Sequence, residues 1–338
     1  MVIKLKGIEH IFHLTEHFLE IWSVYMGIKL DLFDYLQKHP GTPAELAENL
    51  NYRIELVKPW CETMWACGYL NKKDETYSLT RWSKNFLWKE SPTYLGFIIQ
   101  SIETQYLPFL SFNNKFKKTE PFLPYSSQHM IDIATVIAPI AKFVVPFLFN
   151  EIPLLKMKPF VLDIGCGLGA YLITLAERNT KLRGLGIDKE YFLVQRAEEI
   201  ARSRGLQDRI RFLQMDLLEF EFSEEVDCIL ISNVLQAFSM ETNIQLLSQL
   251  SSNLKDDGYL IILECLIDES RVSPKYGILF NMYLRMESLN ARTYTLSEIK
   301  LMLEKSSFRF LSHKSIITGL DLIVAQSLKI SDERRPNC

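Results

Sequence analysis

The stretch VLDIGCGLGA, residues 161–170, decides the fold. An apolar, strand-like run leads into Gly165, Gly167 and Gly169, and a helical pattern begins at about Ala170. Glycines in a turn between a strand and a helix remove side chains, so the backbone can approach a ligand closely. The letters also satisfy the GxGxxA pattern of dinucleotide-binding loops, so a dinucleotide is one possible ligand.

Three carboxylates follow the ends of three successive strand-like runs. Asp163 stands two residues before the first glycine, where a carboxylate suits a cationic amine better than a pyrophosphate. Asp188 ends LRGLGID and is well placed to accept hydrogen bonds from both hydroxyls of a ribose. Asp216 ends RFLQMD, where a carboxylate can accept the exocyclic amine of an adenine. Each acid alone is equally well explained as a solvated loop residue, but together with the glycine loop they predict a site for an amine, a ribose and a base.

The chain after about residue 155 alternates short apolar strands with helical stretches of roughly 10 to 15 residues. This alternation predicts βαβ units and a parallel sheet. In an open sheet of this kind the ligand lies beyond the carboxyl ends of the strands. We therefore expect an α/β, Rossmann-like fold with its site at that edge.

The chain before residue 155 has mainly helical periodicity. Residues 7–37 repeat apolar positions at intervals of three and four, and Thr42 with Glu45 forms a capping-box pattern. A further helical stretch ends near Gly68, and residues 69–80 read as two short strands around a polar turn. Three helices and a hairpin are the order of a winged-helix module. Its third helix is too apolar to read DNA, which favours burial against another chain.

The composition excludes several classes of protein. With 338 residues, 48% apolar residues and a net charge of -3, the chain is long enough for two domains and has no electrostatic footprint for nucleic acid. The start lacks an apolar signal region, and the apolar residues 134–149 are interrupted by Lys142 and two prolines, so we expect a cytoplasmic protein without a membrane span.

Six cysteines without a CxxC pair predict reduced thiols, with no metal cluster and no disulfide framework.

The motifs of both halves resemble a known family. DIGCGLG, Asp188 and the pair MD at 215–216 resemble class I S-adenosylmethionine (SAM) dependent methyltransferases. GIKLDLFDYL, TPAELAENL and GYL with YSLT resemble the dimerisation domain of small-molecule O-methyltransferases, which include plant phenylpropanoid and bacterial polyketide enzymes. The resemblance covers roughly residues 15–328.

The resemblance implies an architecture and partners. Residues 1–100 would form a mainly α, winged-helix dimerisation domain, and residues 101–155 a helical linker that lines the acceptor pocket. Residues 156–330 would form the SAM-binding catalytic domain, with a seven-stranded, mostly parallel sheet, and residues 331–338 a polar tail. The cofactor would be SAM, with S-adenosylhomocysteine as product. The partners would be a small-molecule acceptor and a second copy of the chain.

The resemblance also assigns cofactor contacts. Asp163 and the three glycines would hold the methionine part, and Asp188 would hold the ribose. Asp216 with Leu217 would hold the adenine. Asn233, which follows the fourth strand, joins this cofactor-binding set.

One expected catalytic group is missing. Family members that methylate hydroxyls usually carry Leu-His-Asp-Trp after the fourth strand, with the His as general base, but residues 235–238 read LQAF. Glu264, at the end of the fifth strand, is kept, whereas the family's other acid falls on Ala291. General-base help is worth about 100- to 10,000-fold in rate, and Gln236 cannot supply it. We therefore expect an acceptor without a proton to remove, or with a readily lost one: S-, N-, C- or acidic O-methylation, with Gln236 as a hydrogen-bonding orienter. The other interpretation of Gln236 is a solvent-facing residue at a helix start.

Other side chains are candidates for the missing base. They are His129, Tyr106 and Tyr125 in the linker, and Tyr276 and Tyr283 after the fifth strand. A lone histidine is more often structural. His10, His13 and His17 share a helical face that could bind a metal, but no carboxylate or thiol obviously joins them, so a solvated or interface face is the better interpretation.

Three functions stay open at this point. The first is methyl transfer to a small molecule without the usual His. The second is a different reaction, such as a rearrangement or decarboxylation, in which SAM is kept as an electrostatic element. The third is a winged-helix regulator that binds SAM or a metabolite. The intact SAM-side acids favour the first two, and the apolar third helix disfavours the third.

Overall fold

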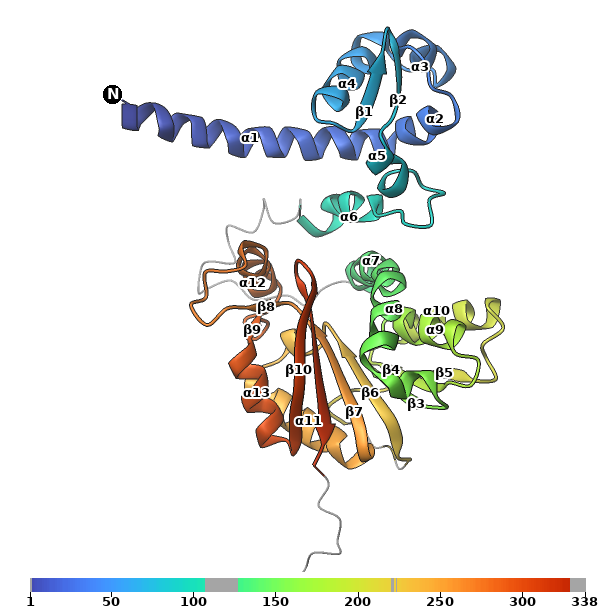
Figure 1. Ribbon diagram of the computed structural model, residues 1–338, viewed down its shortest axis with the longest axis vertical. Helices are drawn as coiled ribbons and strands as arrows, with labels where there is room; N and C mark the ends of the chain where they lie inside the picture. Colours follow the sequence, from blue (N-terminus) through green and yellow to red (C-terminus); the bar gives the residue numbers. More distant parts are fainter. Residues whose placement is uncertain (1, 107–126, 220–221, 223, 329–338) are drawn as a thin grey trace, which may run out of the picture. The chain divides into compact units, whose positions relative to one another are not determined.

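The structure is a computed structural model of the chain, in which residues 2–106, 127–219, 222 and 224–328 are described. The chain divides into two compact units, Met1–Pro108 and Phe109–Cys338 (Figure 1). The predicted polar tail at 331–338 lies outside the described residues.

The first unit is mainly helical. Its elements are α1 (Val2–Lys29), α2 (Leu32–Lys38), α3 (Pro43–Asn49), α4 (Ile54–Ala66), the hairpin β1 (Leu70–Lys73) and β2 (Thr76–Leu79), α5 (Arg81–Phe86), α6 (Gly96–Gln100) and a π-helical turn (Ile102–Tyr106). The order of helices followed by a hairpin agrees with the order expected from the sequence. Phe33, Met64 and Tyr77 are buried in its core, whereas half of Trp65 is exposed.

Local signals account for the ends of these helices. The capping box before α3 is confirmed, because Thr42 Oγ1 accepts the N–H of Glu45 at 3.3 Å and Glu45 Oε2 accepts the N–H of Thr42 at 2.7 Å. Gly68 follows α4 with φ 81°, a backbone conformation that a side chain disfavours. The apolar pattern over 7–37 is divided into α1 and α2, because Asp31 adopts φ 57° between them.

The second unit contains a seven-stranded sheet, as expected. Its strands are β3 (Phe160–Ile164), β4 (Arg183–Asp188), β5 (Ile210–Gln214), β6 (Val226–Ser232), β7 (Leu254–Glu264), β10 (Phe308–Ile317) and β11 (Leu320–Ser327). The spatial order is β10-β11-β7-β6-β3-β4-β5. Strand β11 is antiparallel to both its neighbours, and the other pairings are parallel. The fold is therefore α/β and Rossmann-like, and the order of strands reverses between β3 and β6, where such sheets bind their ligands.

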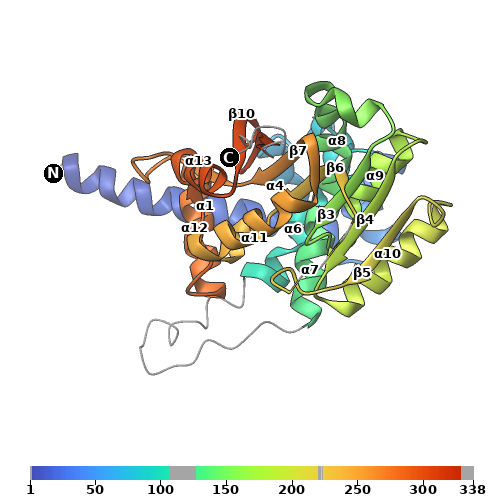
Figure 2. The ribbon, with the colours of Figure 1, turned by 90° about the horizontal axis from the view of Figure 1, so that it is seen from below.

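Helices cover both faces of this sheet (Figure 2). One face packs on α8 (Ala141–Glu151), α9 (Ala170–Arg178) and α10 (Tyr191–Ser203), and the other packs on α11 (Met240–Asn253) and α13 (Leu296–Lys305). Side chains alternate between these two cores along β3, so Val161 lies in one core and Leu162 in the other. A short pair of strands, β8 (Leu266–Ile267) and β9 (Tyr294–Thr295), flanks α12 (Lys275–Glu287).

The helices before β3 belong to the unit with the sheet. They are α7 (Ser127–Ile137), a 3₁₀ turn (Ala138–Ile140), α8 and a second 3₁₀ turn (Pro153–Lys156). Among the described residues one stretch, Gln128–Glu151, has the length and apolar composition of a membrane span. In this structure the 3₁₀ turn divides it, and Ala141, Val144 and Leu148 of α8 are fully buried in the core of the sheet.

Candidate functional site

The glycine loop between β3 and α9 has two kinds of glycine. Gly165 (φ 66°) packs against Val234, because an added Cβ would lie 2.5 Å from Val234 Cγ2. At Gly167 (φ 53°) an added Cβ would make only an ordinary van der Waals contact, with Ala134 Cβ at 3.7 Å. Gly165 is thus needed for packing, whereas Gly167 lines the cavity without a side chain, so a ligand can approach its backbone closely.

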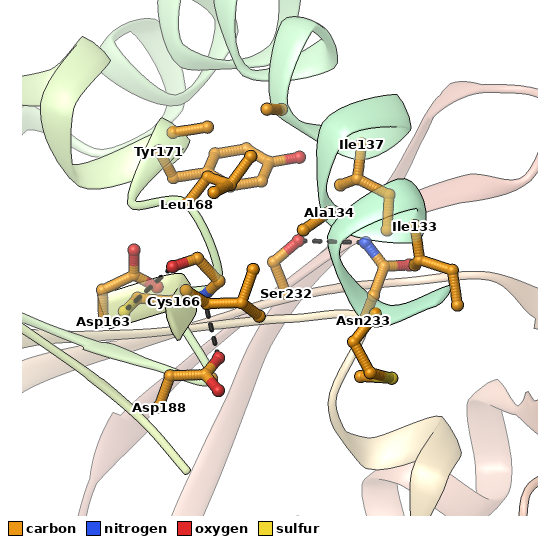
Figure 3. Close-up of a pocket in the computed structure, with 16 residues that line it drawn as sticks. Ile133, Ala134, Ile137, Asp163, Cys166, Leu168, Tyr171, Asp188, Ser232 and Asn233 are labelled. Atoms are coloured by element: carbon orange, nitrogen blue, oxygen red, sulfur yellow. Dashed lines mark hydrogen bonds between the residues drawn. The ribbon is translucent and has the colours of Figure 1, made fainter. Parts of the chain in front are cut away.

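A cavity of about 140 Å³ adjoins this loop, at the carboxyl ends of β3, β4 and β6 (Figure 3). Its polar side chains come from four segments, and they are Asp163, Tyr171, Asp188, Ser232 and Asn233. Its apolar wall comes from α7, with Met130, Ile133, Ala134 and Ile137. The cavity therefore lies at the point where the strand order reverses, as expected for the ligand site of an open sheet.

The two carboxylates of the cavity are buried. Asp163 is 2% exposed, and burial together with the charge of Asp188 raises its pKa to about 8. Asp188 accepts the N–H of Gly167 at 2.9 Å and the N–H of Glu190 at 3.0 Å, so both its oxygens are fixed. Burial also raises the pKa of Asp188. Two buried carboxylates in one cavity provide a strong site for a cation.

The other predicted cofactor residues divide into two groups. Asn233 lines the cavity, has φ 56° and donates from Nδ2 to Ser232 Oγ at 3.2 Å. Asp216 is exposed and Leu217 is buried, and both follow β5 outside the lining of the cavity. Gly169 also lies outside the lining, as the N-cap of α9.

Gln236 lies in a 3₁₀ turn after β6 (Leu235–Ala237) and is 8% exposed. A solvent-facing Gln236 is therefore excluded. Its backbone carbonyl accepts the N–H of Arg292 at 2.8 Å. Its side-chain Oε1 is buried without a hydrogen-bond partner among the residues that the structure describes. This oxygen can accept a hydrogen bond but cannot remove a proton.

Glu264 holds this turn in place through hydrogen bonds to the backbone of the turn. It is 2% exposed at the end of β7, and its Oε1 accepts the N–H of Leu235 at 2.8 Å. The N–H groups of Val234 and Gln236 also donate toward its carboxylate, while burial raises its pKa to about 8. The geometry therefore gives Glu264 a positioning role for the segment that carries Gln236.

Three of the alternative bases, His129, Tyr276 and Tyr283, lie outside the lining of the cavity. His129 on α7 has Nε2 3.4 Å from Glu287 Oε1 on α12, and both side chains are largely buried. Tyr276 is 45% exposed and its ring is stacked on Phe280, with centroids 5.9 Å apart. Tyr283 stacks on the other side of Phe280. The side chain of Tyr106, and the whole of Tyr125, are outside the described part of the structure.

Among residues 2–106, 127–219, 222 and 224–328, no group of three or more His, Cys, Asp or Glu side chains could hold a metal ion. On the predicted histidine face of α1, His13 Nδ1 lies 2.8 Å from Glu16 Oε2 at the surface.

Two contributions to the site were missed in the sequence. Tyr171 lies two residues after the third glycine, so its spacing alone placed it at the start of a helix beside the loop. Ser232 ends the fourth predicted strand and was overlooked beside Asn233. No pattern in the sequence predicted that α7 forms a wall of the cavity, because the packing of this helix onto the glycine loop depends on tertiary contacts.

The comparisons with known proteins agree with this architecture. Residues 156–301 match the family model described as Methyltransferase domain. The chain is 22% identical over 297 residues to 3-hydroxy-5-methyl-1-naphthoate 3-O-methyltransferase of Streptomyces sahachiroi, covering 84% of this chain and 86% of that protein. The structure of human N-acetylserotonin methyltransferase in complex with SAM superposes with a TM-score of 0.80 at 16% identity, covering 95% of this chain and 97% of that one.

Other similarity is confined to part of the chain. Carboxy-S-adenosyl-L-methionine synthase of Nautilia profundicola is 29% identical over 118 residues, which are 35% of this chain and 49% of that protein. The chain thus spans about half the length of this curated relative. The family-model match together with the sheet topology identifies residues 156–301 as a SAM-dependent methyltransferase domain.

Proposed function

We propose that this protein transfers a methyl group from SAM to a small-molecule acceptor of the secondary-metabolite type. The observation that carries the proposal is the pair of buried carboxylates, Asp163 and Asp188, in a cavity beside the glycine loop at the reversal of strand order. Asp163 would attract the ammonium group of the cofactor, and Asp188 would accept hydrogen bonds from the ribose hydroxyls. Asp216 and Leu217, which follow the adjacent strand β5, would contact the adenine.

The residues of the cavity fit this cofactor. Gly167 lines the cavity without a side chain, so a ligand can approach its backbone closely, and the cavity offers carboxylates for a cationic group. When bound, SAM supplies an electrophilic methyl group on a cationic sulfur. The chain's own contribution is to bind and orient the reactants, which supports transfer between well-aligned atoms.

The side chain of Gln236 favours an acceptor that can be methylated without a general base at this position. Gln236 is neutral, buried and has an oxygen without a partner among the described residues, so it suits a donor group of the acceptor. Methylation of S, N, C or an acidic O follows from this chemistry, because a neutral phenol or alcohol needs its proton removed as the methyl arrives.

The proposal is tested with methyl-labelled SAM and a panel of thioether, thiol, aromatic amine, phenol and β-dicarbonyl acceptors. Wild type and Gln236→His are compared on each acceptor. We expect wild type to methylate an acceptor without a strongly held proton, and Gln236→His to give no increase with that acceptor. Wild-type transfer only to neutral phenols would contradict the base-free chemistry and point to a base elsewhere.

A second candidate function is a reaction of SAM that moves no methyl group. The similarity of residues in this chain to carboxy-S-adenosyl-L-methionine synthase favours it. Mass spectrometry of the small molecules after incubation with SAM distinguishes the two functions. Tight SAM binding with no methylated product, and with a new SAM-derived species, would support this second candidate.

We also infer a homodimer formed through the first unit. The first half of α1 extends beyond the other elements of its unit (Figure 1). Large apolar side chains in the first two thirds of α1 are more than half exposed, and they include Ile11, Phe12, Phe18 and Leu19. Several large exposed apolar side chains on one helix are typical of an interface. The free cysteines among the described residues fit a reducing cytoplasm.

A further inference from the structure

Another cavity, of about 270 Å³, lies within the first unit. Most of its lining is apolar or aromatic, and these side chains come from α1, the residue before β1, α5 and α6: Ile21, Val24, Tyr69, Trp82 and Ile99. The described lining contains one carboxylate, Glu20, and neither Lys nor Arg. A concave site with apolar walls and one charged group is typical of a pocket for a small molecule.

Tyr69 fixes the geometry of this cavity. Its hydroxyl donates to Glu20 Oε1 on α1 at 2.8 Å. Its carbonyl oxygen accepts the hydroxyl of Ser83 at 2.6 Å and the N–H of Thr80 at 3.2 Å, which anchors the start of α5. Trp82 lies in that first turn of α5, and its ring is T-shaped against the ring of Tyr69 with centroids 5.6 Å apart. The carboxylate and the two rings are therefore held in place before a ligand binds, which lowers the entropic cost of binding.

The polar groups of the cavity indicate a ligand of positive charge. Among the described residues, the carboxylate of Glu20 accepts a hydrogen bond from Tyr69 and forms no ion pair. Burial and the hydrogen bond to Glu20 raise the pKa of Tyr69, so the phenol stays a donor to this carboxylate. The faces of the Tyr69 and Trp82 rings attract a cation that lies within about 6 Å of the ring centre. A carboxylate beside two aromatic rings is thus an environment that stabilises a cation.

The rest of the lining narrows the class of cation. No group of three or more His, Cys, Asp or Glu side chains in the described part of the chain could hold a metal ion, and His17 is the one other such side chain in this lining. The apolar walls from α1 and α6 suit alkyl groups better than the water shell of a hydrated ion. We propose that this cavity binds a small alkylated ammonium ion, with its charge beside Glu20 and its alkyl groups against Tyr69 and Trp82.

This site and the surface proposed for the dimer use different faces of α1. His17, Ile21 and Val24 line the cavity, and their spacing of four and three residues places them on one face of the helix. Phe18 and Leu19 follow His17 by one and two residues, so they lie on other faces, outside the lining. Dimerisation through Phe18 and Leu19 therefore leaves the face with the cavity unused, and binding of the cation needs no SAM.

The test is isothermal titration calorimetry with choline and with its neutral isostere, in which a carbon atom replaces the quaternary nitrogen. We expect wild type to bind choline at least about tenfold more tightly than the isostere, because only the cation gains from the carboxylate and the ring faces. Glu20→Gln removes the charge but keeps an acceptor for the Tyr69 hydroxyl, and Trp82→Ala removes one ring. Each substitution should weaken choline binding by about fivefold or more.

Trp65→Ala is the matched control. Trp65 is 50% exposed and Trp82 is 51% exposed, and both belong to the first unit, but Trp65 lies outside the lining. Its replacement should leave choline binding unchanged. Thermal unfolding without ligand checks that the variants fold, and if the Tm of Trp82→Ala falls, the comparison rests on Glu20→Gln.

Three outcomes would overturn the proposal. Equal affinity for choline and the isostere would show an apolar hollow that does not select a cation. Choline binding that survives both Glu20→Gln and Trp82→Ala would place the ligand elsewhere on the protein. Folded wild type that does not bind choline would show that the cavity is not a site for this class of ligand.

Discussion

The carboxylate of Glu264 accepts the backbone N–H of Leu235 at 2.8 Å, so the last residue of β7 holds the turn that follows β6. The N–H groups of Val234 and Gln236 donate toward the same carboxylate. In the family that the chain resembles, this acid belongs to the proton-handling groups. Here Glu264 fixes the backbone of the turn that carries Gln236. This indicates that the side chain of Gln236 is held in a defined orientation.

Replacing Glu264 should therefore destabilise the protein. Glu264→Ala leaves buried N–H groups without an acceptor, so we expect the free energy of unfolding to fall by about 1–3 kcal/mol. Glu264→Gln keeps a carbonyl oxygen at the same place and should lose less. Urea denaturation of both variants measures the difference, and equal losses would show that the hydrogen bonds do not carry the effect.

The pH dependence of stability should reflect the same residue. Burial raises the pKa of Glu264 from 4.5 to about 8, so the folded state holds this proton more tightly than the unfolded state does. Its contribution to stability is present at low pH and declines as the pH rises from about 5 to 8. Glu264→Gln removes this titration and should flatten the dependence in that window. A variant with an unchanged slope would contradict the assignment of the slope to Glu264.

Affinity for the cofactor should also depend on pH, through Asp163. Because burial and Asp188 raise its pKa to about 8, Asp163 is mostly protonated in the unliganded protein at pH 7. A cationic ammonium group favours the ionised carboxylate, so affinity for S-adenosylhomocysteine should rise by up to about tenfold per unit toward pH 8 and then level off. Calorimetry in buffers of different ionisation enthalpy should show proton release at pH 7. Asp163→Asn should bind more weakly and without this dependence.

The two glycines of the loop should respond differently to the same substitution. Gly165→Ala combines left-handed backbone with a Cβ 2.5 Å from Val234 Cγ2, so it should lower the free energy of unfolding by more than about 2 kcal/mol. Gly167→Ala should cost about 1 kcal/mol, from the backbone alone, because its Cβ meets no atom nearer than 3.7 Å. Gly167→Ala should nevertheless weaken S-adenosylhomocysteine by narrowing the cavity. Thermal unfolding and calorimetry separate the two effects, and equal destabilisation would contradict the packing role of Gly165.

The proposed dimer depends on the apolar surface of α1. Phe12 and Phe18 are 64% and 61% exposed, so the double substitution to Glu should place charges in the interface and favour the monomer by at least about tenfold. Analytical ultracentrifugation measures the change. Val272→Glu, at an apolar residue of the second unit that is 73% exposed, is the matched control and should leave the association unchanged. A wild type that sediments as a monomer would contradict the inference.

The sequence predicted most of the fold because its signals are local. The capping box of Thr42 and Glu45, and the glycine loop after β3, depend on residues a few positions apart. Parallel pairing then brings the strand ends together, with Ile164 beside Ile187 and Asp188 beside Gln214. Asp163 and Asp188 could therefore be placed at one edge of a sheet from their positions alone.

Local sequence signals did not predict which side chains are buried around Gln236 and Glu264. Gln236 had two interpretations in the sequence, and the packing around its turn excludes the solvent-facing one. Glu264 was expected among proton-handling groups, whereas the structure bonds it to the backbone 29 residues earlier.

The sequence by itself determined the α/β architecture, the mainly helical first unit and the carboxylates of the cofactor site, because periodicity, capping and glycine positions act within one or two turns of chain. Only the tertiary structure decided that α7 walls the cavity, that the buried Tyr171 lines it and that Glu264 holds the turn of Gln236. These features depend on desolvation and hydrogen bonds between distant segments, and such interactions are fixed only when the sheet and its helices pack.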